Sequence, residues 1–209
     1  MSDKKKFKLS PDGLFRQNIV LMSGLVTAPV IVAATTFERA LILTLSFLMI
    51  SYTSILICRF IPRKIAYTVR ILAYVGVAAV MYIPTMLILN AWFPETASQV
   101  SIYIEILVVN SLLLAKTESR FYLMPYSEMA ADALVYVAGY ALAAFAVGII
   151  REFLAYGQLF GMRVCDAPVP AAKTTFFGFF LVGILAAVCR AITNHRRRAR
   201  TDVIRKGAE

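Results

Sequence analysis

Long apolar runs separated by short polar or charged segments fill the sequence between residues 18 and 193. Each run approaches the length of about 20 apolar residues that an α-helix needs to cross a bilayer. Most are apolar on every face, which is typical of membrane helices. The sequence therefore predicts an all-α integral membrane protein with six transmembrane helices. The six runs are Ile19–Thr35, Ala40–Arg59, Val69–Trp92, Val100–Ala115, Met129–Ile150 and Thr174–Ile192.

The order of the runs predicts two related halves, 18–93 and 99–193, between the tails 1–17 and 194–209. Each half holds three runs, and three is an odd number, so the second half enters the membrane from the opposite side to the first. Two such halves with one fold would form an inverted-topology repeat. The first and fourth runs would then be equivalent, and both are short or broken. Equivalent broken helices indicate a site near the middle of the membrane.

Lysine and arginine are distributed unevenly among the segments between the runs. Five lie in the first tail, four between the second and third runs, two between the fourth and fifth, and seven around the last tail. These 18 residues share one side of the membrane, and only Arg39, Arg151, Arg163 and Lys173 fall on the other. Positive charge favours the cytoplasmic side. We therefore expect both termini in the cytoplasm and a location in the bacterial inner membrane.

Composition narrows the function further. The chain is 60% apolar and only 16% charged, which leaves little sequence for a domain outside the membrane. The net charge is +10. We attribute it to basic residues that set the orientation of the chain in the membrane and to basic tails that contact anionic lipid, and not to nucleic-acid binding. Phosphate-binding, zinc-protease and serine-hydrolase motifs are absent, so no catalytic residue is predicted. One histidine and three scattered cysteines predict no metal site.

Four residues of the two short runs are candidates for an ion path or a midplane site. They are Pro29, Glu105, Asn110 and Ser111. A carboxylate inside a membrane helix is a functional hypothesis by default, although Glu105 could equally lie at the interface. Asn110 and Ser111 could instead satisfy a broken backbone, and Pro29 could simply kink its helix.

A charged segment follows the fourth run. Lys116, Glu118 and Arg120 lie there and are candidates for docking a partner subunit, unless the segment is only a solvated loop.

Several stretches resemble the family that contains the E subunit of Rnf electron-transport complexes and the D subunit of the sodium-translocating NADH:quinone oxidoreductase. They are Ala28–Thr35, Glu105–Phe121, Ile150–Gly161 and the proline-rich entry to the sixth run, through Pro168 and Pro170. Members of this family have six spans built as inverted repeats. The resemblance implies a membrane subunit of a complex that couples electron transfer to movement of Na⁺ or H⁺.

The resemblance also bears on cofactors. Family members carry a cysteine before the proline of span one and another after the asparagine of span four, and paired subunits use them to hold an iron–sulfur cluster. This sequence has Ala28 and Ser111 at those positions. Because the cluster needs thiolate ligands, we expect this chain to bind no cofactor and to act as scaffold or ion path. Flavin and iron–sulfur centres are expected on partner subunits.

Two alternatives stay open on the residues alone. The chain could be a small membrane transporter that reuses the same fold, with its site among the candidates of the short runs. It could also be an assembly protein without a site.

Overall fold

The computed structural model describes residues 18–24, 26–119 and 121–206. Helices dominate it, and four of them are long and apolar enough to cross a membrane. These four match the second, third, fifth and sixth predicted runs, so the prediction of an all-α membrane protein is confirmed. They span Phe37–Cys58, Tyr67–Trp92, Tyr126–Tyr156 and Thr175–His195.

The first long helix consists of three segments. It begins as α2 (Phe37–Phe47), passes through one π-helical turn, η2 (Leu48–Tyr52), and ends as α3 (Thr53–Cys58). Thr36 caps its N-terminus, because the Thr36 side chain accepts a hydrogen bond from the backbone N–H of Arg39. The other three long helices are α4 (Tyr67–Trp92), α7 (Tyr126–Tyr156) and α8 (Thr175–Lys206).

The first and fourth predicted runs form shorter elements. The first run contains a turn over residues 19–23 and then α1 (Thr27–Ala33). The fourth contains α5 (Pro94–Ile106), the 3₁₀ turn η3 (Leu107–Val109) and, after a break at Asn110, α6 (Ser111–Ser119). Helix α5 begins six residues before the predicted run. Proline at its first position and Glu95 in its first turn both favour a helix N-terminus.

The remaining elements are short. The 3₁₀ turn η4 (Phe121–Leu123) precedes α7, and the 3₁₀ turn η5 (Pro170–Lys173) precedes α8. A small antiparallel hairpin, β1 (Gln158–Leu159) and β2 (Met162–Arg163), follows α7.

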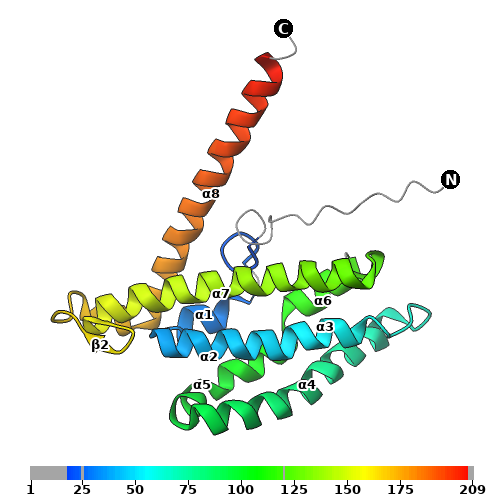
Figure 1. Ribbon diagram of the computed structural model, residues 1–209, viewed down its shortest axis with the longest axis horizontal. Helices are drawn as coiled ribbons and strands as arrows, with labels where there is room; N and C mark the ends of the chain where they lie inside the picture. Colours follow the sequence, from blue (N-terminus) through cyan, green and yellow to red (C-terminus); the bar gives the residue numbers. More distant parts are fainter. Residues whose placement is uncertain (1–17, 25, 120, 207–209) are drawn as a thin grey trace.

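The elongated bundle has two distinct ends, visible at the left and right of Figure 1. The hairpin end, at the left, carries β1, β2 and the start of α8. The loop end, at the right, carries residues 59–66 and 121–125. Helix α8 leaves the bundle at the hairpin end and points away from the other helices (Figure 1). Its bounds extend into the segment predicted as the basic tail.

Helices α2 and α7 form the centre of the bundle. A Cβ atom at Gly148 would lie 2.9 Å from Ala40 Cβ and 2.9 Å from Thr36 O, so only glycine allows this close approach. Farther along, the rings of Phe47 and Tyr140 stack with centroids 4.2 Å apart. Small residues that let backbones approach are the usual basis of helix packing in membranes.

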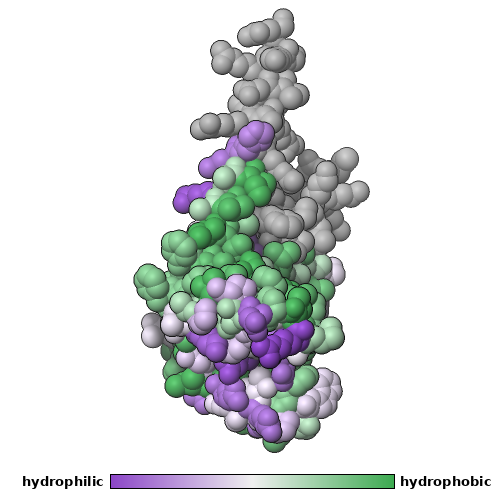
Figure 2. Space-filling model, turned by 90° about the vertical axis from the view of Figure 1, so that its left-hand side faces the viewer, coloured by the Kyte–Doolittle hydropathy of each residue, from purple (hydrophilic) through white to green (hydrophobic). Residues whose placement is uncertain are grey.

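The outer faces of α4 and α8 are apolar and unburied. Leu72, Leu87 and Phe176 each expose more than two thirds of their surface. Figure 2, which views the hairpin end, shows hydrophilic side chains gathered on that end and hydrophobic ones around it and along α8. This separation is the one that a bilayer requires, with apolar flanks and a polar end.

Candidate functional site

The break in the fourth run is centred on Asn110. Its backbone is extended (φ −92°, ψ 141°), which interrupts the helical hydrogen-bond ladder between η3 and α6. The side chain is 3% exposed and bridges two elements, because Nδ2 donates to Leu107 O at 2.6 Å and to Ser51 Oγ at 2.9 Å. Asn110 therefore ties the break to η2, the π-helical turn of the neighbouring helix.

The break in the first run lies before Pro29 rather than at it. Gly24 and Val26 both adopt left-handed backbone conformations, with φ of 65° and 56°, and α1 begins directly afterwards. Pro29 is the third residue of α1, where a backbone N–H has no partner within the helix. The proline therefore costs α1 no hydrogen bond and lies within its first turn, and the break in the run falls three to five residues earlier.

The two breaks meet at one cleft of about 190 Å³, which we call the break cleft. Pro29 and Asn110 both line it, as does Ala28. Its remaining lining residues are Val26, Thr27, Ile106 and Val109. Asn110 and Thr27 supply the polar side chains among apolar neighbours. The structure thus brings together two of the four residues predicted as ion-path candidates.

The other two candidates are placed differently. Glu105 is exposed at the end of α5, outside the lining of the break cleft, and accepts a hydrogen bond from Tyr82 Oη at 3.2 Å. Ser111 begins α6 directly after the break, and its side chain lies outside what the structure describes.

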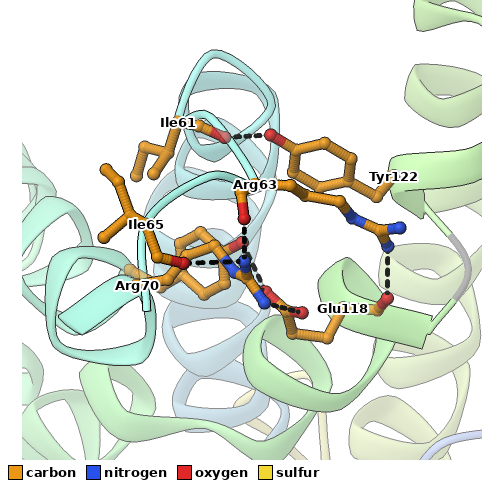
Figure 3. Close-up of polar contacts among 7 residues, drawn as sticks. Ile61, Arg63, Ile65, Arg70, Glu118 and Tyr122 are labelled. Carbon is orange, nitrogen blue, oxygen red and sulfur yellow. Dashed lines mark hydrogen bonds and ion pairs between the residues drawn. The ribbon is translucent and has the colours of Figure 1, made fainter. Parts of the chain in front are cut away.

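A second polar cluster lies at the loop end, where Glu118 of α6 contacts side chains of α4 (Figure 3). Arg70 donates from Nε to Oε1 at 2.6 Å and from Nη2 to Oε2 at 2.7 Å, and Tyr74 Oη donates to Oε1 at 2.7 Å. The Arg70 and Glu118 side chains are only 10% and 17% exposed. This two-pronged geometry is the strongest that an arginine and a carboxylate can form.

The pair also sets the charge of Glu118. Hydrogen bonding from Arg70 holds the pKa of the Glu118 carboxyl below its usual value of 4.5, although burial opposes the shift. A carboxyl with a lowered pKa stabilises the fold fully above that usual value and loses its contribution as the pH falls through the lowered one. Glu118 is therefore ionised at neutral pH.

The loop at residues 59–66 is fastened onto this pair (Figure 3). Arg63 Nη2 donates to Glu118 O at 3.0 Å, and Arg70 Nη1 donates to Arg63 O at 3.0 Å and to Ile65 O at 3.2 Å. Tyr122 Oη donates to Ile61 O, and the Arg63 guanidinium lies 4.5 Å from the centroid of the Tyr122 ring. Together these contacts close the loop over the end of α6.

The residues predicted to dock a partner thus make contacts within their own chain. Glu118 pairs with Arg70, and the Lys116 ammonium lies 5.2 Å from the centroid of the Tyr136 ring on α7. Arg120 lies outside the described residues.

Arg151 and Glu152, at the end of α7, organise the hairpin end and were missed as site residues from the sequence. Arg151 is fully buried and donates to five backbone carbonyls, those of Ile31, Ala34, Ala172, Lys173 and Thr174, at 2.7–3.5 Å. Glu152 accepts hydrogen bonds from the backbone N–H groups of Phe37 and Gly161, each at 2.7 Å. The sequence did offer a signal, because an Arg-Glu pair directly follows a long apolar run. The charge count assigned this pair to a loop outside the membrane.

Helix α8 approaches this centre through a glycine. A Cβ atom at Gly178 would lie 2.3 Å from Ile31 O and 3.2 Å from an Arg151 nitrogen. Arg151 therefore joins the end of α1, the end of α7 and the start of α8.

The fold and the break cleft define a class of protein: a predominantly helical membrane protein in which two broken segments meet at one cleft. Residues 6–188 match the family described as "Rnf-Nqr subunit, membrane protein". The chain belongs to this family, as its resemblance predicted.

Two relatives illustrate the relationship. The chain is 27% identical over 196 residues to the D subunit of a Na⁺-translocating NADH-quinone reductase from Yersinia pestis (strain Pestoides F), covering 88% of this chain and 93% of the relative. It is 23% identical over 206 residues to the E subunit of a proton-translocating ferredoxin:NAD⁺ oxidoreductase complex from Clostridium ljungdahlii, covering 97% of both.

The residues of the break cleft do not fit the iron–sulfur cluster that the family resemblance implies. None of the seven described residues that line it carries a thiol, and Ala28 occupies one of the two expected cysteine positions. Cys58, Cys165 and Cys189 lie in α3, after the hairpin and in α8 respectively, outside this lining. Among the described residues, no three His, Cys, Asp or Glu side chains gather as metal ligands would.

Proposed function

We propose that this chain is a membrane subunit of an ion-translocating electron-transport complex of the Rnf/Nqr kind, in which it serves as scaffold or ion path and not as cluster ligand. The observation that carries the proposal is the break cleft. Two broken segments of a family member meet there, and the lining residues offer an amide and a hydroxyl but no thiolate. Such a lining can contact water or a cation, whereas a cluster needs cysteines.

The same proposal covers the topology. We take α1 and the α5–α6 pair to complete six crossings as two inverted halves, with the loop end in the cytoplasm and both termini on that side. The basic residues Arg59, Arg63, Lys64 and Arg70 at the loop end support this orientation. The protein would then lie in the bacterial inner membrane, with its basic tails against anionic lipid.

The electron carriers belong to other subunits in this account. Flavin and iron–sulfur centres would lie on partner chains, and the moving ion would be Na⁺ or H⁺. One named relative is a subunit of a Na⁺-translocating enzyme and the other of a proton-translocating enzyme. Similarity to these relatives is therefore compatible with either ion. The transporter and assembly-protein alternatives have no observation in their favour.

Inverted membrane vesicles test the coupling directly. Vesicles from a strain that lacks this chain should lose ion uptake driven by the electron donor of the complex, and expression of the wild-type chain should restore it. Uptake driven by ATP hydrolysis in the same vesicles is the control for leakiness. Donor-driven uptake that is unchanged in the deletion strain would contradict the proposed function.

A further inference from the structure

Two buried hydroxyl groups, on α3 and α6, have no hydrogen-bond partner among the described residues. They are Ser54 Oγ on α3 and Thr117 Oγ1 on α6. Ser54 is fully buried and Thr117 is 1% exposed. An unsatisfied buried hydroxyl is destabilising, and other hydroxyls of the first long helix avoid that cost by bonding to the carbonyl four residues earlier, as Ser46 and Thr53 do. The two exceptions therefore call for an oxygen-bonding occupant such as water.

The helices that carry these hydroxyls pack against each other, since α3 and α6 are in contact. Ser54 follows Ser51 by three residues, so both lie on the face of their helix that meets Asn110. On α6, Lys116 contacts α7 and Glu118 contacts α4, and Thr117 is directed between them because successive helical residues turn by about 100°. Helix α3 lies on that side, because it packs against α4 as well as α6.

The polar groups form a sequence that runs from the break cleft toward the loop end. It starts at the contact between Asn110 and Ser51, 2.9 Å across. Ser54 lies about 4.5 Å farther along α3, and Thr117 about 10 Å farther along α6, at 1.5 Å of rise per residue. The π-helical turn η2 contains Ser51, and π-helical turns inside α-helices occur frequently at functional sites.

The ion pair of Arg70 and Glu118 closes this sequence at the loop end. Glu118 follows Thr117 directly, and its side chain and backbone carbonyl fasten α6 to α4 and to Arg63 of the loop (Figure 3). The other end of α6 is the break at Asn110, where the backbone ladder is interrupted. Helix α6 is therefore a short segment between the break at Asn110 and the Arg70–Glu118 ion pair.

We propose that the interface between α3 and α6 is a water path from the loop end to the break cleft, and that the Arg70–Glu118 pair is the latch that keeps it closed. Ser54 and Thr117 are the hydroxyls that bind water along it. This inference rests on the ion-path role proposed above and makes that role more specific. The water path would be the route by which water or a hydrated ion reaches Asn110.

Thiol labelling tests the path without relying on ion transport. The three native cysteines are replaced by alanine, and Ser54→Cys or Thr117→Cys is introduced singly into the full chain in its own membranes. A charged, membrane-impermeant methanethiosulfonate is applied to either face of the vesicles. Ile57→Cys is the matched control, since Ile57 lies on the same helix as Ser54 but is 39% exposed, and in the proposed topology its exposed surface would face lipid.

We expect both path cysteines to react slowly with the latch intact and about tenfold faster when Glu118→Gln opens it, because accessibility follows the population of the open state. Ile57→Cys should stay unreactive in both backgrounds. Tyr74→Phe removes one hydrogen bond to Glu118 and keeps both charges, so it should give an intermediate rate and serves if Glu118→Gln fails to accumulate.

Two results would overturn the proposal. Path cysteines as unreactive as Ile57→Cys in every background would mean that no water path exists. Path cysteines equally reactive with and without the latch would mean that the ion pair closes nothing. Neither result changes the subunit composition or donor-driven uptake of the wild-type complex, so failure of the path is distinguishable from failure of the proposed function.

Discussion

Arg151→Met should lower the apparent melting temperature of the detergent-solubilised protein more than any other single substitution considered. Arg151 is fully buried and donates to five carbonyls from two separate segments, the end of α1 and the turn η5 with the residue that follows it. Methionine fills a similar volume and donates nothing, so these carbonyls lose their shared donor. Each unsatisfied buried acceptor costs about 1–3 kcal/mol. A net loss of about 3 kcal/mol corresponds to about 6–12 °C in a chain of this length.

The matched control lies on the same end of the bundle. Arg163, in β2, pairs with Asp166 just after the hairpin, and the two side chains are 74% and 96% exposed. Arg163→Met should therefore shift the melting temperature little, since exposed ion pairs contribute about 0–1 kcal/mol. Intrinsic tryptophan and tyrosine fluorescence during heating measures both variants. Equal melting temperatures for Arg151→Met and Arg163→Met would refute the role given to Arg151.

Asn110→Ala should reduce donor-driven ion uptake by inverted vesicles about tenfold while the complex still assembles. Alanine removes the hydrogen bonds to Leu107 O and Ser51 Oγ that join the break to η2. Two buried hydrogen bonds contribute about 0.5–1.5 kcal/mol each, and about 1.4 kcal/mol corresponds to a tenfold change in rate. The amide would also be lost from the break cleft, where it is one of the two polar side chains.

Asn90→Ala provides the comparison for this experiment. Asn90 lies near the end of α4 and is exposed, outside the lining of the break cleft. Its removal should leave uptake unchanged at equal amounts of assembled complex. Uptake by the Asn110→Ala complex that matches the Asn90→Ala complex would exclude the break cleft from the ion path.

The long helices were predictable from the sequence because a membrane helix needs one simple signal, an apolar run of sufficient length. The ends of the helices were harder to predict. Helix α5 begins at Pro94, in a polar stretch that hydropathy assigns to a loop, and α6 continues to Ser119 through two charged residues. Glu118 is tolerated there because Arg70 lies opposite, a contact between residues 48 positions apart.

The candidate sites were predictable only where a polar residue stands out within an apolar run. Asn110 was a candidate because an amide in an apolar run is conspicuous, and the structure places it at a break beside Pro29. Arg151 and Glu152 were not recognised, because some of their partners, such as Ile31 and Phe37, lie more than 100 residues away in the sequence. The π-helical turn at Ser51 has no sequence signal that hydropathy can detect.

The central claim is that this chain works within a redox-driven complex without ligating a cluster. Mild-detergent purification of the tagged chain from its own membranes tests it most directly, with co-purifying chains identified by mass spectrometry and iron and flavin assayed in the same sample. The account predicts redox subunits at fixed stoichiometry, with flavin and iron bound to the partners and none left on this chain after it is separated from them. A homo-oligomer free of iron and flavin, or iron retained by the isolated chain, would contradict the account.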